Sequence, residues 1–362
     1  MKGGPPLLRS IFPRPSRPCI TLAAMAVHYS VIGAGAVGTL LAVTLARNGN
    51  DAVLISRGEP GKKPLRRRVQ IEHATREHPE RVHFSVLHDD EQAAAGGVTV
   101  LCVQAHDIAA AVTEHASLFG PLRTVVAIQA GIPWWYFSHS PVHVNRPIVA
   151  VDPDGRIGRT ISSAEVVGGV LETATVVHRP GLVHANAVVR LHLGEIDNVP
   201  KPRTADLAAA FTAGLVQATT TTQIRTAIWR KLVTDIAIQP MSALTRATPA
   251  EMCADPIVRG KLAHVMREAM TLAASFDVMP DATAESHLEQ LSRSKHLTTM
   301  LRDALVNRPL EIDALTGAAL ELAKLNDVAV GSILELDALT RLLDRSLRTP
   351  RDLGENSPAA LR

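Results

Sequence analysis

A glycine-rich segment near the start of the chain has the spacing of a phosphate-binding loop. It follows the G-x-G-x-x-G pattern and consists of Gly33, Ala34, Gly35, Ala36, Val37 and Gly38. The first glycine allows a tight turn, the second lets the backbone approach a pyrophosphate, and the third permits close packing of the following helix. The N-terminus of that helix presents free N–H groups and the positive end of its dipole to the phosphates. The segment therefore predicts a dinucleotide-binding site.

The end of the second predicted strand indicates which dinucleotide is bound. A site selective for NAD usually has Asp or Glu there to accept hydrogen bonds from the ribose, whereas this chain has Ser56 and Arg57. A guanidinium can bind a 2′-phosphate through charge-assisted hydrogen bonds, which are worth about ten- to a hundredfold in cofactor preference. We therefore expect NADP, with Arg57 at the 2′-phosphate. We interpret the basic run at 66–68 as a solvated loop.

The elements around the glycine loop indicate a parallel sheet. A strand pattern at 28–32, a helix at 37–48 and a buried strand at 52–56 form the start of a βαβ unit. Further strands are expected at 82–87, 98–103, 124–128 and 148–151, and a helix at 107–119. This alternation predicts a Rossmann-type, doubly wound sheet. Strand-like segments between 166 and 195 predict antiparallel hairpins that close one edge of it.

Helical periodicity dominates the chain beyond the threonine run at 219–222. The predicted helices include 224–238 and 255–276, and Asp255 followed by Pro256 is typical of a helix start. We therefore expect an α/β protein whose Rossmann-type domain is followed by an all-helical domain. The expected division is an NADP-binding domain at 25–222 and a helical substrate domain at 223–349. Residues 1–24 are interpreted as a disordered or mis-started extension and residues 350–362 as a tail.

Composition excludes several classes of protein. With 46% hydrophobic and 20% charged residues the chain is globular, and a net charge of +3 gives no sign of nucleic-acid or membrane binding. Its three cysteines are far apart, which favours a reducing, cytoplasmic location. We interpret Cys102 as a core residue. No histidines have metal-ligand spacing, so no metal site is expected.

The aromatic run Trp134-Trp135-Tyr136-Phe137 follows a sheet strand and the segment 129–133. Ligands of open α/β sheets bind at such strand ends. The run could line a substrate or nicotinamide pocket, or it could pack between the two domains. The sequence leaves both interpretations open.

Several motifs in the same order resemble those of the ketopantoate reductase (2-dehydropantoate 2-reductase) family, over about residues 29 to 343. They are the GAGAVG loop, Arg57, the Gly-Ile-Pro-Trp-Trp-Tyr-Phe stretch from Gly131, the Ile-Arg-x-x-Ile-Trp-Arg-Lys-Leu helix ending at Leu232, and two motifs between Thr298 and Asp313. The resemblance implies NADPH-dependent reduction of a small 2-oxo acid in a cleft between the domains. Composition predicts a soluble protein, and a homodimer is one assembly that the sequence leaves open.

The resemblance also implies roles for individual residues. Lys231 would be the general acid that protonates the forming alkoxide, and Glu311 would bind a substrate hydroxyl and organise the cleft. Thr299 would replace the usual serine at the substrate. Gln104 and Ala130 would stand beside the cofactor.

Four positions depart from the family pattern. Gln104 replaces a lysine, Ala130 replaces an asparagine, and Asp235 and Gln239 replace two asparagines that follow Lys231 at the substrate. Residues four apart share one face of a helix, so Lys231 and Asp235 are expected to form an ion pair. That carboxylate favours the charged lysine and repels an anionic substrate. Two alternatives therefore stay open: a reductase of a less anionic carbonyl compound, or a catalytically silent NADP(H)-binding protein.

Overall fold

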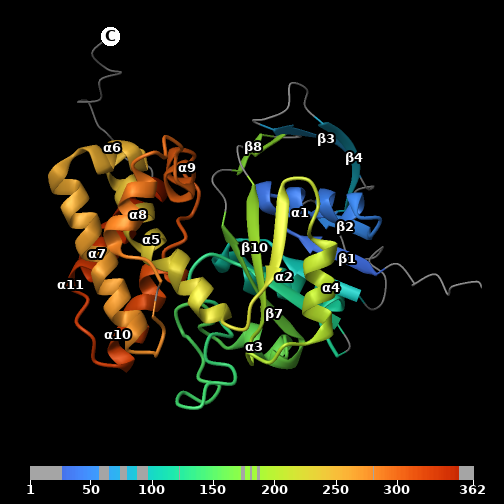
Figure 1. The fold of residues 1–362 in the computed structure, drawn as a ribbon, viewed down its shortest axis with the longest axis horizontal. Coiled ribbons are helices and arrows are strands. Elements are labelled where there is room, and N and C mark those ends of the chain that lie inside the picture. The colour runs from blue at the N-terminus through green and yellow to red at the C-terminus, as the bar shows by residue number, and fades with distance from the viewer. Residues whose placement is uncertain are drawn as a thin grey trace, which may run out of the picture.

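The protein is described by a computed structural model in which a sheet region and a helical region lie side by side (Figure 1). The described residues are 27–56, 65–73, 80–87, 97–121, 123–172, 176–179, 182–185, 188–279 and 281–349. For the strands at 65–73, 80–87, 176–179 and 182–185 only the backbone is described. The two terminal segments discussed above and Arg57 lie outside the described residues. The expected division at 222–223 falls between the last strand of the sheet and the first long helix.

Within the described residues the sheet has eleven strands in the order β11-β10-β7-β6-β5-β1-β2-β4-β3-β9-β8. Their bounds are β1 His28–Ile32, β2 Asp51–Ile55, β3 Leu65–His73, β4 Glu80–Leu87, β5 Gly97–Leu101, β6 Arg123–Ile128, β7 Val166–Glu172, β8 Val176–Arg179, β9 Leu182–Ala185, β10 Val189–Glu195 and β11 Val216–Thr220. The central strands β2, β1, β5, β6 and β7 are mutually parallel. The pairs β7–β10, β3–β4 and β8–β9 are antiparallel.

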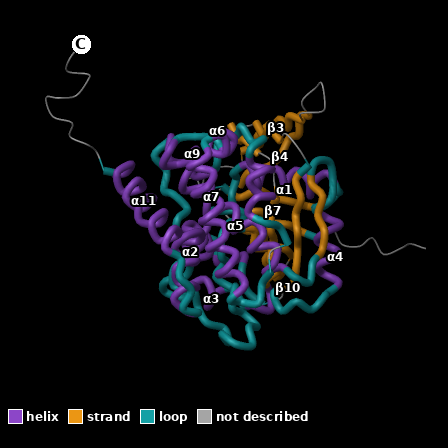
Figure 2. The backbone as a smooth tube through the Cα atoms, turned by 60° about the vertical axis from the view of Figure 1, so that its left-hand side comes forward, coloured by secondary structure: helices purple, strands orange, loops and turns teal. Residues whose placement is uncertain are grey.

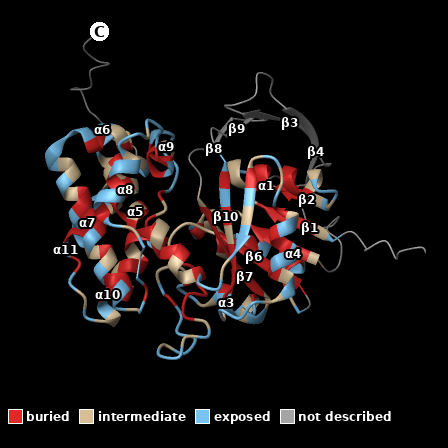
Figure 3. Cartoon of the chain, viewed as in Figure 1, coloured by how far each residue is buried: buried red, intermediate tan, exposed pale blue. Residues whose placement is uncertain are grey.

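The central strands are almost wholly apolar because helices and loops cover both of their faces. Val31 of β1 lies between Leu54 and Val100 in the register, and all three are buried (Figure 3). One face packs on α1 (Ala36–Arg47) and α4 (Pro202–Ala210). The other face belongs to a core that continues into the helical region. The two regions therefore share apolar packing, which holds the cleft between them in place.

The helical region is built around α5 (Ile224–Thr245), which packs against α7, α9 and α11 (Figure 2). Its other elements are α6 Pro249–Ala254, α7 Pro256–Ala274, α8 Ala284–Leu291, α9 Thr299–Leu305, the π-helical turn η4 Asp313–Gly317, α10 Ala318–Leu325 and α11 Gly331–Arg348. Asp255 caps α7 by accepting from the backbone N–H groups of Ile257 and Val258, as its position before Pro256 predicts. The expected α/β fold with an all-helical second part is confirmed.

Several local predictions were wrong. The segment expected as a strand at 148–151 forms turns, because the Glu321 carboxylate of α10 binds the N–H groups of Val149 and Ala150. The helix expected at 107–119 is only Ile108–Glu114 (α2), flanked by the 3-10 turns η1 Ala105–Asp107 and η2 Ala116–Leu118.

The sequence prediction also missed regular structure. The basic run at 66–68 was interpreted as a loop, yet its backbone lies in β3. Short turn-bounded helices at Arg156–Thr160 (α3) and Ser163–Glu165 (η3), and β11 at the opposite edge of the sheet, were not predicted. Edge and peripheral elements of this kind are fixed by tertiary contacts more than by local propensity.

The aromatic run packs between the two regions. Its four side chains are buried, and Trp229 of α5 donates from Nε1 to the Tyr136 hydroxyl oxygen at 2.6 Å. Arg225 of α5 donates to the carbonyl oxygens of Tyr136, Ser138 and Ile196 at 2.7 to 2.9 Å. Burial raises the pKa of Tyr136 to about 12 although Trp229 and Arg225 oppose the shift. Of the two interpretations, the structure supports the one in which the run packs between the domains.

Candidate active site

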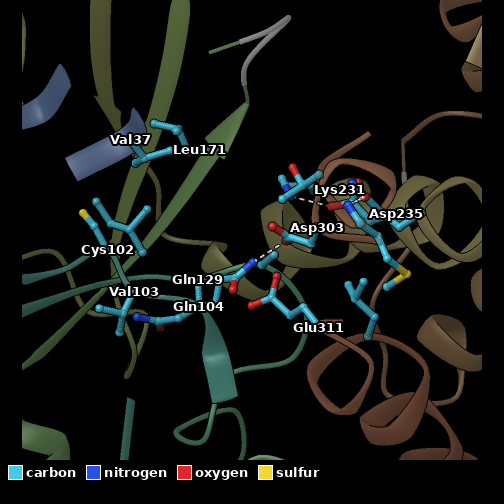
Figure 4. A pocket seen from close by; sticks show the side chains of 16 residues that line it. Val37, Cys102, Val103, Gln104, Gln129, Leu171, Lys231, Asp235, Asp303 and Glu311 are labelled. Atoms are coloured by element: carbon cyan, nitrogen blue, oxygen red, sulfur yellow. Dashed lines mark hydrogen bonds and ion pairs between the residues drawn. The ribbon is translucent and has the colours of Figure 1, made fainter. Parts of the chain in front are cut away.

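A cavity of about 200 Å³ lies where the carboxyl ends of the sheet strands face the helical region (Figure 4). Neutral side chains line its sheet side, among them Val37, Cys102, Leu171, Gln104 and Gln129 (Figure 4). The charged side chains Lys231, Asp235, Asp303 and Glu311 come from the helical region (Figure 4). The expected site residues that line it are Val37, Gln104, Ala130, Lys231, Asp235, Gln239, Thr299 and Glu311. The structure thus brings together residues from both halves of the chain.

Helix α5 supplies three of these residues on one face. Lys231, Asp235 and Gln239 follow each other at intervals of four, and the Lys231 ammonium donates to the Asp235 carboxylate. The Nε2 atom of Gln239 donates to Oδ1 of Asp235 at 3.4 Å. Its carbonyl oxygen accepts from the backbone N–H of Met300 at the start of α9 at 3.1 Å. The ion pair and the amide are therefore held in one orientation.

The environment of Lys231 favours the charged ammonium. Burial by itself lowers the pKa of Lys231, but the carboxylates of Asp235, Glu311 and Glu172 outweigh it, so the pKa is raised. Asp235 is 7% exposed, so little solvent screens the closest of these charges. Lys231 therefore carries a proton at neutral pH.

Glu311 connects the two regions across the cavity. It lies just before the π-helical turn η4, and its Oε1 atom accepts from the backbone N–H of Ala105 at 2.7 Å. Burial raises the pKa of Glu311 to about 7, and the Ala105 N–H and Lys231 only partly oppose this shift. Its proton can therefore be gained or lost near neutral pH.

A second polar link between the regions lies beside Glu311. The Gln104 amide donates from Nε2 to Asp303 Oδ2 at 2.8 Å. Asp303 is 5% exposed and shares the inner face of α9 with Thr299, four residues earlier. Because Gln104 stands where a lysine was expected by resemblance, this neutral amide is the group that meets the buried Asp303 carboxylate.

Close backbone approach also fixes the regions to each other. The Ile132 N–H donates to the Ala314 carbonyl oxygen at 2.8 Å. Gly131 has a φ of +79°, and a Cβ there would lie 2.1 Å from the same oxygen. Only glycine combines this conformation with this contact.

A neighbouring cavity of about 540 Å³ covers the glycine loop. The predicted cofactor residues Gly33, Ala34, Gly35, Ala36 and Val37 line it, together with Ser56 and Gln104. A Cβ on Gly38 would lie 2.0 Å from the Gly33 carbonyl oxygen, so the third glycine serves packing of α1. Among the described residues, a Cβ on Gly35 would meet nothing within 4 Å, and no side chain caps the N-terminus of α1. The open space and the uncapped N–H groups fit a dinucleotide pyrophosphate.

Positive charge from the helical region also reaches this cavity. Arg302 and Arg308 line it, and Arg308 lies 3.6 Å from Asp303. Cys102, expected in the core, is half-buried and lines both cavities. Burial raises the pKa of its thiol to about 12, so it stays protonated at neutral pH.

A third and larger cavity, of about 650 Å³, opens from the Lys231 side of the central one. The two cavities share Val37, Lys231, Asp235, Gln239 and Thr299. The larger one extends to α8 and to β10, where sequence reasoning identified no functional residue.

Sequence reasoning assigned no role to Asp303, Gln129, Arg190 or His287, which the structure places in these cavities. Spacing within α9 relates Asp303 to Thr299 and could have identified it. The other three come from separate elements, so no local signal relates them to Lys231.

The described residues contain no cluster of His, Cys, Asp and Glu side chains that could hold a metal ion. Every helix in the described part of the chain is too short or too polar to cross a bilayer.

Comparison with known proteins places the chain in one family. Residues 29–198 match the family "Ketopantoate reductase PanE/ApbA", and residues 223–344 match its C-terminal part. A 2-dehydropantoate 2-reductase of Mesorhizobium japonicum is 32% identical over 318 residues, which are 87% of this chain and 97% of that protein. A 2-dehydropantoate 2-reductase of Halobacterium salinarum is 25% identical over 46% of this chain and 55% of its own length.

Solved structures show the same architecture. A candidate ketopantoate reductase from Ralstonia solanacearum MolK2 is 28% identical with a TM-score of 0.78, over 88% of this chain and 98% of that one. D-mandelate dehydrogenase in a ternary structure with NADH and anilino(oxo)acetate has a TM-score of 0.71 over 89% of this chain and 100% of that one. Because D-mandelate dehydrogenase is only 18% identical to this chain, the similarity to it shows the fold alone. From these matches and the glycine-loop geometry, the chain belongs to the ketopantoate reductase family and is an oxidoreductase with a nicotinamide cofactor.

Proposed function

We propose that this protein catalyses the NADPH-dependent reduction of a 2-oxo acid, most directly 2-dehydropantoate to pantoate, with Lys231 as the general acid. The observation that carries the proposal is a charged Lys231 that lines one small cavity together with Glu311. Val37 and Gln104 line both this cavity and the glycine-loop cavity, so the two adjoin. The Mesorhizobium japonicum relative is named for this reaction. When bound, NADPH supplies a hydride equivalent to the carbonyl carbon.

Lys231 supplies the proton. Reduction of a carbonyl places negative charge on its oxygen, and an ammonium within reach stabilises that charge and then donates a proton from Nζ. The raised pKa of Lys231 keeps this proton in place before reaction. General-acid catalysis of this kind contributes about a hundred- to ten-thousandfold.

The other polar residues position the substrate. Thr299 and Gln239 are proposed to bind the substrate's polar groups, and Glu311 to accept from a hydroxyl while it holds Ala105. On the sheet side, the backbone of 33–38 is proposed to bind the pyrophosphate, with Gln104 and Ala130 beside the cofactor. Arg57 is proposed to select NADP over NAD by binding the 2′-phosphate.

One observation favours a second candidate, a reductase of a less anionic carbonyl compound. Asp235 adds a buried carboxylate next to Lys231, and Gln104 provides no positive charge on the opposite wall. Arg225 and Arg230 do not compensate, because Arg225 binds three carbonyl groups between the regions and Arg230 pairs with Asp281. A catalytically silent binding protein is disfavoured by the proximity of Lys231 and Glu311 in one cavity.

The setting of the enzyme is also a proposal. We infer a cytoplasmic protein, divided at 222–223 into a cofactor-binding and a substrate-binding domain, and a homodimer in solution. A Staphylococcus aureus ketopantoate reductase with the same fold is described as dimeric. Light scattering of the purified protein tests the oligomeric state directly.

The experiment for the reaction is NADPH oxidation with 2-dehydropantoate as substrate. The expected result is turnover that falls about a hundredfold or more in Lys231→Ala, while NADPH binding persists. A matched control is Lys261→Ala. Lys261 of α7 forms an ion pair with Glu335 of α11 and lines none of the three cavities. Absence of turnover by protein shown to bind NADPH would exclude 2-dehydropantoate and leave the second candidate.

A further inference from the structure

The large cavity next to Lys231 offers more space than a small 2-oxo acid needs. It holds about 650 Å³, against about 200 Å³ for the central cavity, and it begins at the residues proposed to hold the reacting carbonyl. From Lys231 and Asp235 it reaches to α8 and to the sheet at Arg190 of β10. A substrate bound at Lys231 can therefore extend into this space.

His287 of α8 is a candidate ligand-binding residue on the wall of the large cavity that α8 forms. Its side chain lines the cavity and the residue is only 8% exposed. Its Nδ1 atom lies 3.1 Å from the Thr234 hydroxyl, whereas its buried Nε2 atom has no hydrogen-bond partner. Buried polar atoms of proteins are nearly always paired. Because the unpaired Nε2 atom belongs to a residue that lines this cavity, a ligand bound beside it would supply the missing partner. Burial lowers the pKa of His287, so the imidazole is neutral.

Arg190 supplies an available positive charge at the same cavity. Arg230, on the neighbouring wall, is held by Asp281 at 2.7 and 2.8 Å and lies 3.8 Å from Glu172. Arg190 lies opposite Glu172 in the β7–β10 register and is exposed to the cavity. Within the described part of the chain its guanidinium makes no hydrogen bond or ion pair.

We propose that this cavity binds a second carboxylate at the far end of a substrate, so that 2-oxo dicarboxylic acids are substrates in addition to 2-dehydropantoate. Arg190 pairs with the distal carboxylate and the Nε2 atom of His287 donates a hydrogen bond to it. The proposal rests on the proposed reduction and extends its substrate class. It also offers a reason for Asp235: attraction at the distal end offsets the repulsion that this carboxylate exerts near the reacting carbonyl.

Steady-state kinetics test this assignment. The substrates are 2-dehydropantoate, 2-oxoglutarate and 2-oxoadipate, and the proteins are the wild type, Arg190→Gln and Arg293→Gln. Arg293 is a matched control because it lies on the surface near the same cavity, is 78% exposed and does not line it. We expect kcat/KM of the dicarboxylic acids to fall about tenfold or more in Arg190→Gln, because KM rises while kcat stays unchanged. The value for 2-dehydropantoate should stay within about twofold in the same variant.

Binding of non-reacting acids separates failure of the subsite from failure of the reaction. Calorimetry with the NADP-bound protein is expected to show tighter binding of adipate than of pentanoate, lost in Arg190→Gln and weakened in His287→Asn. Equal binding of the two acids, or equal effects of Arg190→Gln and Arg293→Gln, would overturn the subsite even if 2-dehydropantoate is reduced. Absence of any turnover together with Arg190-dependent adipate binding would reject the proposed reaction and still support the subsite.

Discussion

The sheet side and the helical side of the cleft use different chemistry. The sheet side offers backbone N–H groups at the glycine loop and neutral side chains in the central cavity, with an open space above Gly35 and no acidic residue in the first turn of α1. The helical side offers titratable groups, with Lys231, Asp235 and Glu311 lining one small cavity. Cofactor binding therefore depends on backbone shape, whereas proton transfer and substrate choice depend on side chains.

This difference determines how each side responds to substitution. A change on the sheet side should alter the affinity for NADPH and leave the rate at saturation nearly intact. A change on the helical side should do the reverse. The predictions below test this division.

The largest effect is expected for Lys231→Ala. Loss of the general acid should lower kcat about a hundred- to ten-thousandfold, while the Kd of NADPH stays within about twofold. Stopped-flow fluorescence of NADPH gives both quantities. If kcat decreases by less than about tenfold, another group supplies the proton.

Arg57→Ala is expected to change cofactor choice. Removal of a guanidinium that binds the 2′-phosphate should reduce the preference for NADPH over NADH about ten- to a hundredfold. The ratio of kcat/KM for the two cofactors is the measurement. An unchanged ratio would assign the 2′-phosphate to other groups, among which Arg302 and Arg308 line the glycine-loop cavity.

Gly35→Asp should weaken NADPH binding without disturbing the fold. The new side chain has space around it, but its charge would face the cofactor phosphates, so we expect at least about a tenfold higher Kd. Gly260→Asp on α7 is a matched control, because a Cβ there also meets nothing within 4 Å. Equal Kd values for the two variants would contradict phosphate binding at the glycine loop.

Restoring the family pattern should raise activity toward 2-dehydropantoate. In the triple variant Gln104→Lys, Ala130→Asn and Asp235→Asn, a cation and an amide are gained and the carboxylate beside Lys231 is lost. We expect a rise in kcat/KM of about tenfold, the order of one charge-assisted hydrogen bond. No rise would mean that these three departures do not limit this reaction.

The pH profile should depend on Glu311. Its pKa of about 7 lies above the usual value, so the group gains its proton as the pH falls through about 7 and then accepts hydrogen bonds less well. We expect kcat/KM to fall about tenfold from pH 8 to pH 6 and Glu311→Gln to abolish this acidic limb. Because the pKa of Lys231 is raised, deprotonation of Lys231 should cause no loss of activity below about pH 10.

The sheet side could be predicted from sequence to a large extent. The glycine spacing, the strand before it and the helix after it lie within one short segment, and the structure has them as expected. By contrast, the strand expected at 148–151 failed because its backbone N–H groups bind Glu321, which is far away in the sequence. Local patterns contain no information about such a contact.

The helical side was accessible mainly through resemblance and helix spacing. The interval of four residues predicted that Lys231 and Asp235 pair, as the structure shows. The contacts of Gln104 with Asp303 and of Glu311 with Ala105 join segments about 200 residues apart, and neither was predicted. Arg190 and His287 line one cavity only because β10 and α8 both border it.

The division between the two sides is tested most directly by single-turnover rates measured over a range of NADPH concentrations for Lys231→Ala and Gly35→Asp. We predict that Lys231→Ala lowers the plateau rate and keeps the half-saturating NADPH concentration, while Gly35→Asp raises that concentration and keeps the plateau. If the two variants change the plateau rate alike and also change the half-saturating NADPH concentration alike, cofactor binding and proton transfer are not divided between the two sides.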